Sequence, residues 1–585
     1  MADSLPAYPF EAARLIGTVI EVGPDHARAN LPLAASREPQ LRHGERVGAG
    51  EVGEFVIVEA GDVGVFGRIT LVKLPDRDRF SVETRMGSSS EAKPIGTISL
   101  LTTIPLAGGA PMRGVTRFPR VGSRVFSVDP SLVTWIADHA GSPGEKTATK
   151  GRLLKLDLAN LPGSTTAVVR VTPERLFGRH CAILGATGGG KSWTLARIIE
   201  RCCLFEAKVI LIDATGEYHG FCDRIRHLSL GSRKDRPRNC RDVALPYTAL
   251  EELDLFALLR PSPGVQAPRL RSAIKSLKLA QVLPNSPLVV DGRISKEGEL
   301  REPFERACAE HATLIDGTSA DFDITKLAHQ IELECVWPTG YAQGDQGRWG
   351  RKHEGDIGHC TSLILRAESC LSSPDLAPVF RSSGMSSVLD EIDEFLSSNR
   401  ESVLRISLRH LAYGQNVREV VANGIGRHLL QRAREGRFQE QPLVVCIDEA
   451  HQFLNKWLGD EFSRYPLDAF ELIAKEGRKY SLSVCISTQR PRDIPDAVIG
   501  QMGTLLVHRL TNHRDQEVVE RAAGDIDRSA VAFLPSLAPG QAVLLGIDYP
   551  IPLIIQISPP ATPPDSSGPN FQKAWKERRT APTAN

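Results

Sequence analysis

The chain has 585 residues, of which 41% are hydrophobic and 24% charged, and its formal net charge at pH 7 is +1. This length allows roughly three or four domains with a sizeable core, and the composition is that of an ordinary globular protein. A net charge close to zero excludes a general attraction to nucleic acid, so any DNA binding must depend on locally clustered charge.

Cysteine usage and hydropathy indicate the cellular setting. Eleven cysteines occur without a Cys-x-x-Cys pair, and Cys446 and Cys485 lie within expected core strands. This pattern predicts reduced thiols, not disulfides or zinc ligands. No apolar run reaches transmembrane length, and the amino terminus lacks the charged-then-apolar pattern of a signal peptide. We therefore expect a soluble, cytoplasmic protein with no membrane segment.

The first part of the chain is rich in β-type sequence. Three such segments, 15–22, 54–58 and 63–74, are separated by turns, and Gly61-Asp62 is a hairpin signal. Glycines inside the third segment suggest a bulge or sharp bend, as small barrels need. We therefore expect residues 1–172 to form a β-barrel that serves in assembly or docking.

The rest of the chain alternates strand and helix patterns. A strand-type run at 207–213 follows the first glycine-rich motif, and the sheet pattern resumes at 403–408. Between them, several stretches have helical spacing and are separated by Pro- and Gly-containing breaks. The expected divisions are 173–239 (first part of the nucleotide-binding core), 240–402 (inserted, mainly helical subdomain), 403–558 (second part of the core) and 559–585 (flexible tail).

A phosphate-binding loop lies between a strand-type run, 180–184, and a helix-compatible run that starts at Trp193. Its glycines let backbone N–H groups curl around a triphosphate, Lys191 reaches the outer phosphates, and the Ser192 hydroxyl can bind Mg²⁺. We therefore predict ATP and Mg²⁺ as ligands. The nucleotide-binding residues are Gly185, Ala186, Thr187, Gly188, Gly189, Gly190, Lys191, Ser192 and Trp193.

Two acids follow a second buried strand at 443–447. In this class of site Asp448 would hold the magnesium shell through water, and Glu449 would orient and deprotonate the attacking water. A further strand ends at Gln489, which places this side chain where a γ-phosphate sensor belongs. A plain polar turn is the alternative interpretation of Gln489.

Five motifs in order resemble the HerA family, within the HerA/FtsK superfamily of hexameric, ring-shaped DNA translocases. They lie at 179–192, 213–218, 447–453, 476–480 and 487–491. The resemblance runs from about residue 14 to 555, because the opening barrel is also similar to that of the family. Two departures are mild: Gly189 stands where serine is frequent, and Ala214-Thr215 replace a Pro-His type pair. The implied fold is α/β, a RecA-like P-loop NTPase core with an amino-terminal β-barrel and an inserted helical subdomain.

The resemblance implies roles for two arginines. Arg478 falls where the family has an arginine that reaches a neighbouring subunit's γ-phosphate, and Arg179 matches a second phosphate-directed arginine. Such a guanidinium stabilises charge on the transferring phosphoryl group. The alternative for both is a surface salt bridge. Glu217, in the second motif, could take part in the site or could cap the turn in which it lies.

The implied activity is ATP-driven movement of double-stranded DNA through a homohexameric pore. The resemblance also implies an effector partner, such as a NurA-like nuclease or a sirtuin-like defence protein, in DNA end processing or anti-phage defence. Two alternatives stay open: a ring that scaffolds an effector enzyme, and a secretion or conjugation motor. Two basic clusters are candidate DNA contacts, although charge runs are usually solvated faces. They are Arg269, Arg271, Lys275 and Lys278, and Arg348, Arg351 and Lys352.

Overall fold

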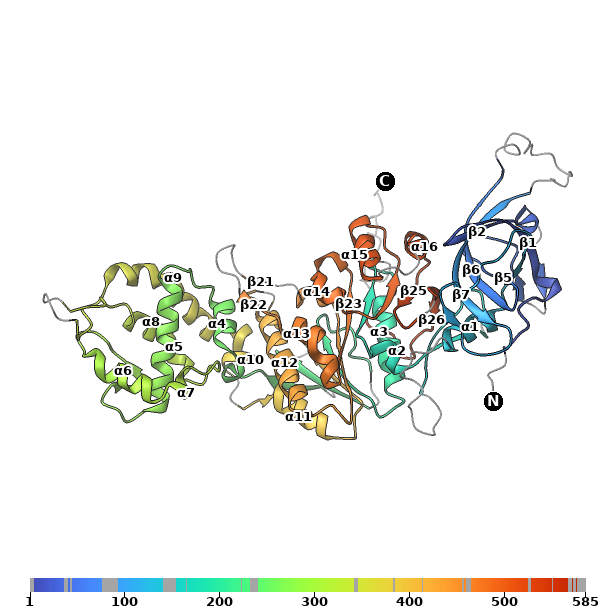
Figure 1. The fold of residues 1–585 in the computed structure, drawn as a ribbon. Helices are drawn as coiled ribbons and strands as arrows, with labels where there is room; N and C mark the ends of the chain where they lie inside the picture. The colour runs from blue at the N-terminus through green and yellow to red at the C-terminus, as the bar shows by residue number, and fades with distance from the viewer. Residues whose placement is uncertain are drawn as a thin grey trace, which may run out of the picture.

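The computed structural model has three parts that follow one another along its long axis (Figure 1). A β-barrel lies at one end, a large mixed sheet in the middle and a helical body at the other end. The structure describes residues 5–575 except 36–39, 43–44, 76–92, 140–153, 165, 222–223, 232–239, 341–345, 382–383, 413, 455–456, 459–464, 524–527, 550, 567–570 and 572–574.

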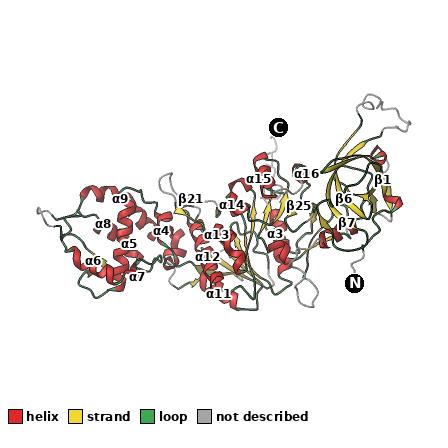
Figure 2. Cartoon of the chain, viewed as in Figure 1, coloured by secondary structure: helices red, strands yellow, loops and turns green. Residues whose placement is uncertain are grey.

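The amino-terminal part is a closed barrel of six antiparallel strands (Figure 2). They are β1 (Leu15–Val22), β2 (His26–Asn30), β5 (Phe55–Ala60), β6 (Val63–Lys73), β7 (Ile95–Pro105) and β9 (Arg124–Ser127). Neighbours pair in the order β2-β1-β9-β5-β6-β7, and pairing of β2 with β7 closes the barrel. The β6–β7 register shifts at Gly67, which confirms the expected bulge and gives the curvature that closure requires.

Short elements accompany the barrel. They are β3 (Gln40–Arg42), β4 (Glu45–Val47), β8 (Met112–Arg113) and helix α1 (Pro130–His139). α1 packs its buried face, which includes Trp135 and Ile136, against the edge of the central sheet. The helix therefore joins the barrel to the rest of the chain.

The central sheet has thirteen strands in the order β11-β10-β26-β25-β24-β12-β23-β20-β13-β19-β14-β15-β18. From β24 to β18 all pairs are parallel, and from β24 to β11 they are antiparallel. The parallel strands are β24 (Thr504–His508), β12 (Cys181–Leu184), β23 (Leu482–Thr488), β20 (Leu443–Ile447), β13 (Lys208–Asp213), β19 (Val403–Ser407), β14 (Ile225–Leu230), β15 (Cys240–Ala244) and β18 (Ser386–Ser387). The antiparallel edge holds β25 (Gln541–Gly546), β26 (Leu553–Ile557), β10 (Leu156–Asn160) and β11 (Val168–Val171).

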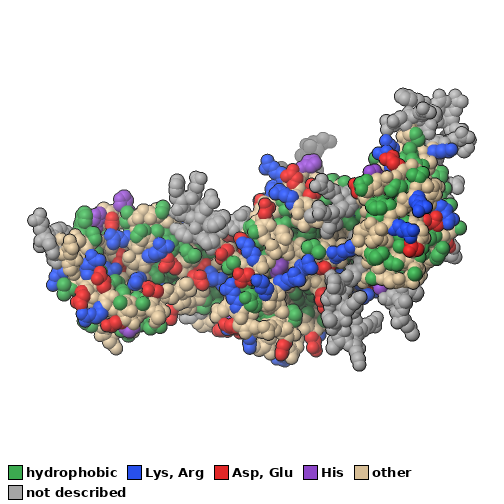
Figure 3. Space-filling model, viewed as in Figure 1, with side chains coloured by type: hydrophobic (Ala, Val, Ile, Leu, Met, Phe, Trp, Pro, Cys, Tyr) green, Lys and Arg blue, Asp and Glu red, His purple; other side chains and the backbone are tan. Residues whose placement is uncertain are grey.

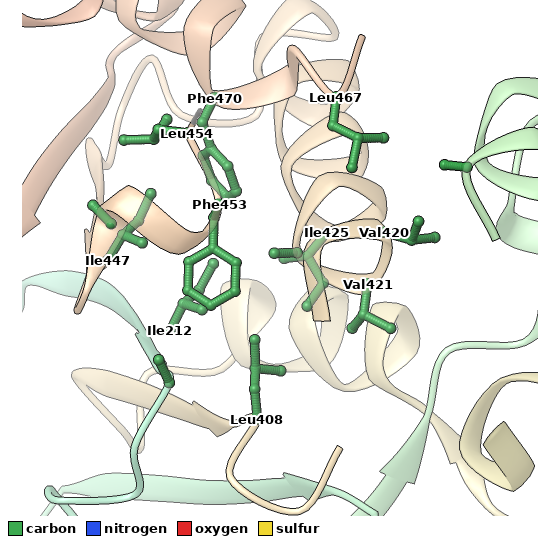
Figure 4. Close-up of a cluster of buried hydrophobic side chains, with 14 of the residues drawn as sticks. Ile212, Leu408, Val420, Val421, Ile425, Ile447, Phe453, Leu454, Leu467 and Phe470 are labelled. Carbon is green, nitrogen blue, oxygen red and sulfur yellow. The ribbon is translucent and has the colours of Figure 1, made fainter. Parts of the chain in front are cut away.

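Helices cover both faces of this sheet, which explains why its central strands β12 and β20 are apolar at every position. α3 (Lys191–Cys202) packs on one face, while α12 (Val417–Arg434) and α13 (Ala469–Glu476) pack on the other. Figure 4 shows Val421 and Ile425 of α12 in the same apolar cluster as Ile212 and Ile447 of the sheet. The remaining helices of this part are α2 (Pro173–Phe177), α11 (Val388–Ser397), α14 (Asp496–Ile499), α15 (His513–Ala523) and α16 (Arg528–Val531).

The inserted helical body lies at the end opposite the barrel (Figure 1). Its helices are α4 (Glu252–Leu259), α5 (Gln266–Val282), α6 (Arg301–Glu310), α7 (Ala312–Ile315), α8 (Leu327–Leu333), α9 (Glu354–Ser372) and α10 (Ala377–Phe380). Buried residues of α4, α5, α8 and α9 belong to the same apolar core as α12. The insertion is therefore packed against the sheet domain.

The expected α/β fold is confirmed, but four strands belong to a different part of the fold than the sequence indicates. β10 and β11, which the sequence groups with the barrel, hydrogen-bond with the central sheet through β26. β15 and β18 lie within the range expected to be helical, yet both belong to the same sheet. We therefore propose that the barrel ends after β9 and that the helical insertion lies between β15 and β18. Residues 576–585 of the expected tail lie outside the described residues.

One buried arginine joins the barrel to the sheet domain. Arg68 on β6 is fully buried, with its guanidinium between the rings of Phe55 and Phe533, 5.3 Å from each centroid. Its Nη2 donates a hydrogen bond of 3.1 Å to the carbonyl of Pro552, just before β26. Because Phe533 and Pro552 belong to the sheet domain, this side chain holds two parts of the fold together.

Replacing Arg68 with alanine should destabilise this contact by about 2–4 kcal/mol, because two cation–π contacts and a charged hydrogen bond are lost from a buried site. We expect a lower Tm in thermal unfolding, with Arg68→Lys intermediate because lysine lacks the planar guanidinium. The matched control is Arg117→Ala, which removes an exposed barrel arginine paired with Asp62. An R68A variant that unfolds at the temperature of the unchanged protein would contradict this role.

Candidate active site

The phosphate loop has the conformation that its glycines permit. Gly188 and Gly190 adopt left-handed conformations with φ values of 75° and 116°, which a residue with a Cβ rarely takes. α3 begins at Lys191, directly after the loop, so its amino terminus and its dipole face the loop. The loop, Lys191 and Ser192 line a cavity of about 510 Å³. The structure thus forms the strand, loop and helix that the sequence predicts.

Lys191 faces three acidic side chains in this cavity. Its pKa is lowered by burial, and Glu449, Asp448 and Glu217 act in the opposite direction. The pKa values of all three carboxyl groups are raised, in each case mainly by burial. Burial thus disfavours the charged forms of these carboxyl groups, and a cation bound beside them would favour those forms.

The chain turns sharply at Glu449. This residue is in the left-handed conformation, with φ 47°, which is uncommon for a residue other than glycine and typical of functional sites. Phe453 and Leu454, a few residues later, are buried in the core beside α12 (Figure 4). Nδ1 of His451 lies 3.2 Å from Oε2 of Glu449. The strain at Glu449 is therefore held by apolar packing on one side and by β20 on the other.

Gln489 lies beside the phosphate loop. The Thr187 hydroxyl donates a hydrogen bond of 2.6 Å to Oε1 of Gln489. The contact arises because β12 and β23 are parallel neighbours, with Leu184 opposite Thr488, so the loop and Gln489 leave the sheet at the same edge. Gln489 also lines the cavity with Lys191 and Glu449. This position favours the sensor hypothesis over a solvated turn.

One wall of the cavity was predicted from the sequence and the opposite wall was not. Trp193 on α3 is 41% exposed and lines the cavity. The other side of the cavity comes from chain more than 340 residues later: Pro539, Gly540, Gln556, Ile557, Pro559 and Ser566. No motif marks these residues, because β25 and β26 come next to α3 only through the order of strands in the sheet. They are the functional candidates that sequence reasoning missed.

His508, at the end of β24, packs against the phosphate loop. Sequence reasoning did not predict this role either. Its Nε2 lies 2.8 Å from the hydroxyl of Thr194, and its Nδ1 lies 2.8 Å from the carbonyl oxygen of Gln541. A neutral ring satisfies both contacts, with Nδ1–H donating to the carbonyl and Nε2 accepting from the hydroxyl. A Cβ at Gly190 would approach His508 to 3.2 Å, so the ring lies directly against the loop.

Acid should destabilise this support. Burial lowers the pKa of His508 to about 4, against about 6.5 in an unfolded chain. Between these values the unfolded state binds more protons, so stability that is fully present above pH ~6.5 is lost as the pH falls towards 4. We expect the Tm of His508→Gln, which cannot titrate, to depend less on pH over this range. The control is His513→Gln on exposed α15, and equal pH profiles for H508Q and the unchanged protein would exclude this role.

The two predicted arginines share a second cleft, of about 430 Å³, which also contains Lys475, Lys479 and His180. Arg179 precedes β12, and Arg478 precedes β23, so both lie at the amino ends of parallel strands. The Arg478 guanidinium is exposed and has no ion pair among the described residues, whereas Arg179 lies 3.8 Å from Asp548. Figure 3 shows Lys and Arg side chains gathered between α13 and α2, where this cleft lies.

The two basic clusters proposed as DNA contacts have local partners. Arg269 pairs with Asp356, Arg271 with Glu252, Lys275 with Asp316 and Lys352 with Glu332. Lys278 and Arg348 donate to the carbonyls of Gly317 and Gly298. This arrangement favours the interpretation of both clusters as solvated, salt-bridged surfaces.

The fold and the cavity define a class of protein. A phosphate loop after β12, two acids after β20 and a glutamine after the strand between them are the parts of a P-loop ATPase with a RecA-like sheet. In the part of the chain that the structure describes, no helix is both long and apolar enough to cross a membrane.

Comparison with known proteins finds similarity to HerA proteins. The family described as "Helicase HerA, central domain" matches residues 156–327. A probable helicase of Methanocaldococcus jannaschii is 21% identical over 416 residues, which cover 69% of this chain and 70% of the relative. The DNA double-strand break repair helicase HerA of Sulfolobus acidocaldarius is 21% identical over 428 residues, which cover 72% and 73%. Residues 156–327 thus match a HerA family, and about 70% of the chain is similar to proteins named as helicases, HerA among them.

Solved structures include similar folds at lower identity. The plasmid coupling protein TrwB, in complex with ADP and Mg²⁺, is 17% identical with a TM-score of 0.41, and the match covers 72% of this chain and 94% of that chain. VirB4 of Thermoanaerobacter pseudethanolicus is 15% identical with a TM-score of 0.39, over 70% and 97%.

Proposed function

We propose that this ATPase moves double-stranded DNA as a homohexameric ring, with each ATP bound at a boundary between subunits. The relatives named as DNA repair helicases support DNA as the substrate. The observation that carries the ring is the separation of the phosphate cavity from the arginine cleft within one chain. The free thiols of the described cysteines support a cytoplasmic location.

Hydrolysis within one site follows from the cavity. Ser192 and Asp448 would hold Mg²⁺, which supplies positive charge to the phosphate oxygens. The buried carboxyl groups of Asp448 and Glu449 fit such an ion, because a bound cation favours their charged forms. Glu449 would accept a proton from the attacking water, and Lys191 would neutralise charge on the outer phosphates. Gln489 would orient the γ-phosphate or the water, starting from its contact with Thr187.

The arginines act on a different subunit's nucleotide in this proposal. β23 has seven residues, so its two ends are about 23 Å apart at the usual rise per residue. Arg478 lies before one end and Gln489 after the other. Since no side chain spans that distance, Arg478 and Arg179 serve a phosphate outside their own chain. A guanidinium delivered in this way contributes roughly 10³–10⁵ in rate.

A mixing experiment tests the shared site. Lys191→Ala and Arg478→Ala should each abolish hydrolysis when alone. In an equal mixture, about a quarter of the boundaries would combine an intact Lys191 with an intact Arg478 from the neighbour, because ring subunits meet head to tail. We therefore expect the mixture to regain a substantial fraction of the unmixed protein's ATPase rate, as measured by phosphate release.

The control mixture combines Lys191→Ala with a Lys191→Ala, Arg478→Ala double variant, which can form no complete site. Recovery in the first mixture only, together with a hexameric mass by sedimentation, supports the ring. An Arg478→Ala protein that hydrolyses ATP at the full rate, or as a monomer, would overturn it.

DNA should stimulate hydrolysis and bind through its phosphates. With 6–10 phosphate contacts, binding should weaken by roughly 10³–10⁵ between 50 and 200 mM salt because counterions are released. The measurements are duplex affinity over a salt series and ATPase rate with and without duplex. A secretion motor or a ring that only scaffolds an effector would not respond to duplex, so an unchanged rate together with salt-independent binding would exclude translocation.

We further propose that the ring works with an effector protein, such as a nuclease in end processing or an enzyme of anti-phage defence. The barrel supports this role because it lies at one end of the molecule and exposes apolar side chains, including Tyr8, Phe118 and Val121. Co-purification of the complex from its native cell would identify the partner.

A further inference from the structure

We infer that Glu217 is a further residue of the ATP site, which positions the magnesium ion through the Ser192 hydroxyl. The inference rests on ATP hydrolysis and not on the proposed movement of DNA. Glu217 follows β13, which is the parallel neighbour of β20, so it leaves the sheet at the same edge as Asp448 and Glu449. It lines the phosphate cavity together with Ser192.

The turn that carries Glu217 is capped by another residue. The carboxylate of Asp213 accepts hydrogen bonds of 2.7 Å from the N–H of Gly216 and 3.3 Å from the N–H of Tyr218. It also accepts one of 2.7 Å from Nε of the buried Arg405. Asp213 therefore fixes the backbone on both sides of Glu217, so the cap of this turn does not depend on the Glu217 side chain.

Close packing and two further contacts hold the turn rigid. Gly216 has φ 85°, and a Cβ there would lie 2.5 Å from Cδ of Arg409, so only glycine fits. Tyr218 is buried and stacks on Phe221. The carbonyl of Glu217 accepts a hydrogen bond of 2.8 Å from the N–H of Asp565, in the segment that follows β26. A turn fixed from several sides keeps the Glu217 side chain in the cavity.

The carboxyl group of Glu217 can accept a further hydrogen bond. Its Oε2 is buried and makes no hydrogen bond among the described residues. Burial raises its pKa, while the Ser192 hydroxyl, as a hydrogen-bond donor, opposes the rise. An acceptor beside the hydroxyl that binds Mg²⁺ can orient that hydroxyl or a water of the metal shell. Together with Asp448 it would supply the negative charge that a divalent ion requires.

The test measures metal dependence as well as rate. Removing such an outer partner typically weakens metal affinity by about 10–100-fold. The probe is a fluorescent, non-hydrolysable ATP analogue. For Glu217→Gln we expect the Mg²⁺ concentration that gives half-maximal binding of this analogue to rise by about 10–100-fold. Binding of the same analogue in EDTA should stay unchanged. Glu217→Asp should recover part of the Mg²⁺ affinity, and excess Mg²⁺ should restore part of the ATPase rate of E217Q.

Two comparison variants separate a metal role from a structural one. Asp213→Asn weakens the cap of the turn and should lower the Tm, whereas Glu217→Gln should leave the Tm nearly unchanged. Glu252→Gln, in the helical insertion, removes an acid far from the cavity and should alter neither measurement. If E217Q binds the analogue with the same Mg²⁺ dependence as the unchanged protein, or only lowers the Tm, the inference is wrong whatever the protein does with DNA.

Discussion

The parallel pairing of β12, β23, β20 and β13 is the constraint on which the rest of this structure depends. Residue-by-residue register between these strands brings their carboxyl ends to one edge and their amino ends to the other. The phosphate loop, Asp448, Glu449 and Gln489 therefore meet at one edge, although more than 250 residues separate the first from the rest. The same geometry places Arg179 and Arg478 together at the opposite edge.

Ionisable side chains are buried at the carboxyl edge of the sheet, and contacts within the fold hold them there. Burial raises the pKa values of Asp448, Glu449 and Glu217 and lowers that of Lys191, so it disfavours the charged forms of all four groups. Rigid supports keep these groups in place: the Asp213–Arg405 pair behind the Glu217 turn, and the packing of Phe453 behind Glu449. A site held in this way gains most when a nucleotide and a cation enter together.

A short path also leads from the phosphate loop to the barrel. The N–H of Gly540 donates to the carbonyl of Gly189, and the same segment carries Phe533, whose ring covers the buried Arg68 of β6. The loop and the barrel are therefore joined through one stretch of the sheet domain.

The sequence by itself determined the local chemistry. The loop at 185–192 and the acids after a buried strand could be predicted in this way, because glycine patterns and apolar runs are set by neighbours along the chain. Only the tertiary structure decided the strand order, which moved β10 and β11 from the barrel to the sheet and brought β26 to the cavity. It also placed His508 against the phosphate loop and made Asp213 the residue that caps the turn before Glu217. These are contacts between residues distant in sequence, and the patterns of single segments carry no record of which surfaces will meet.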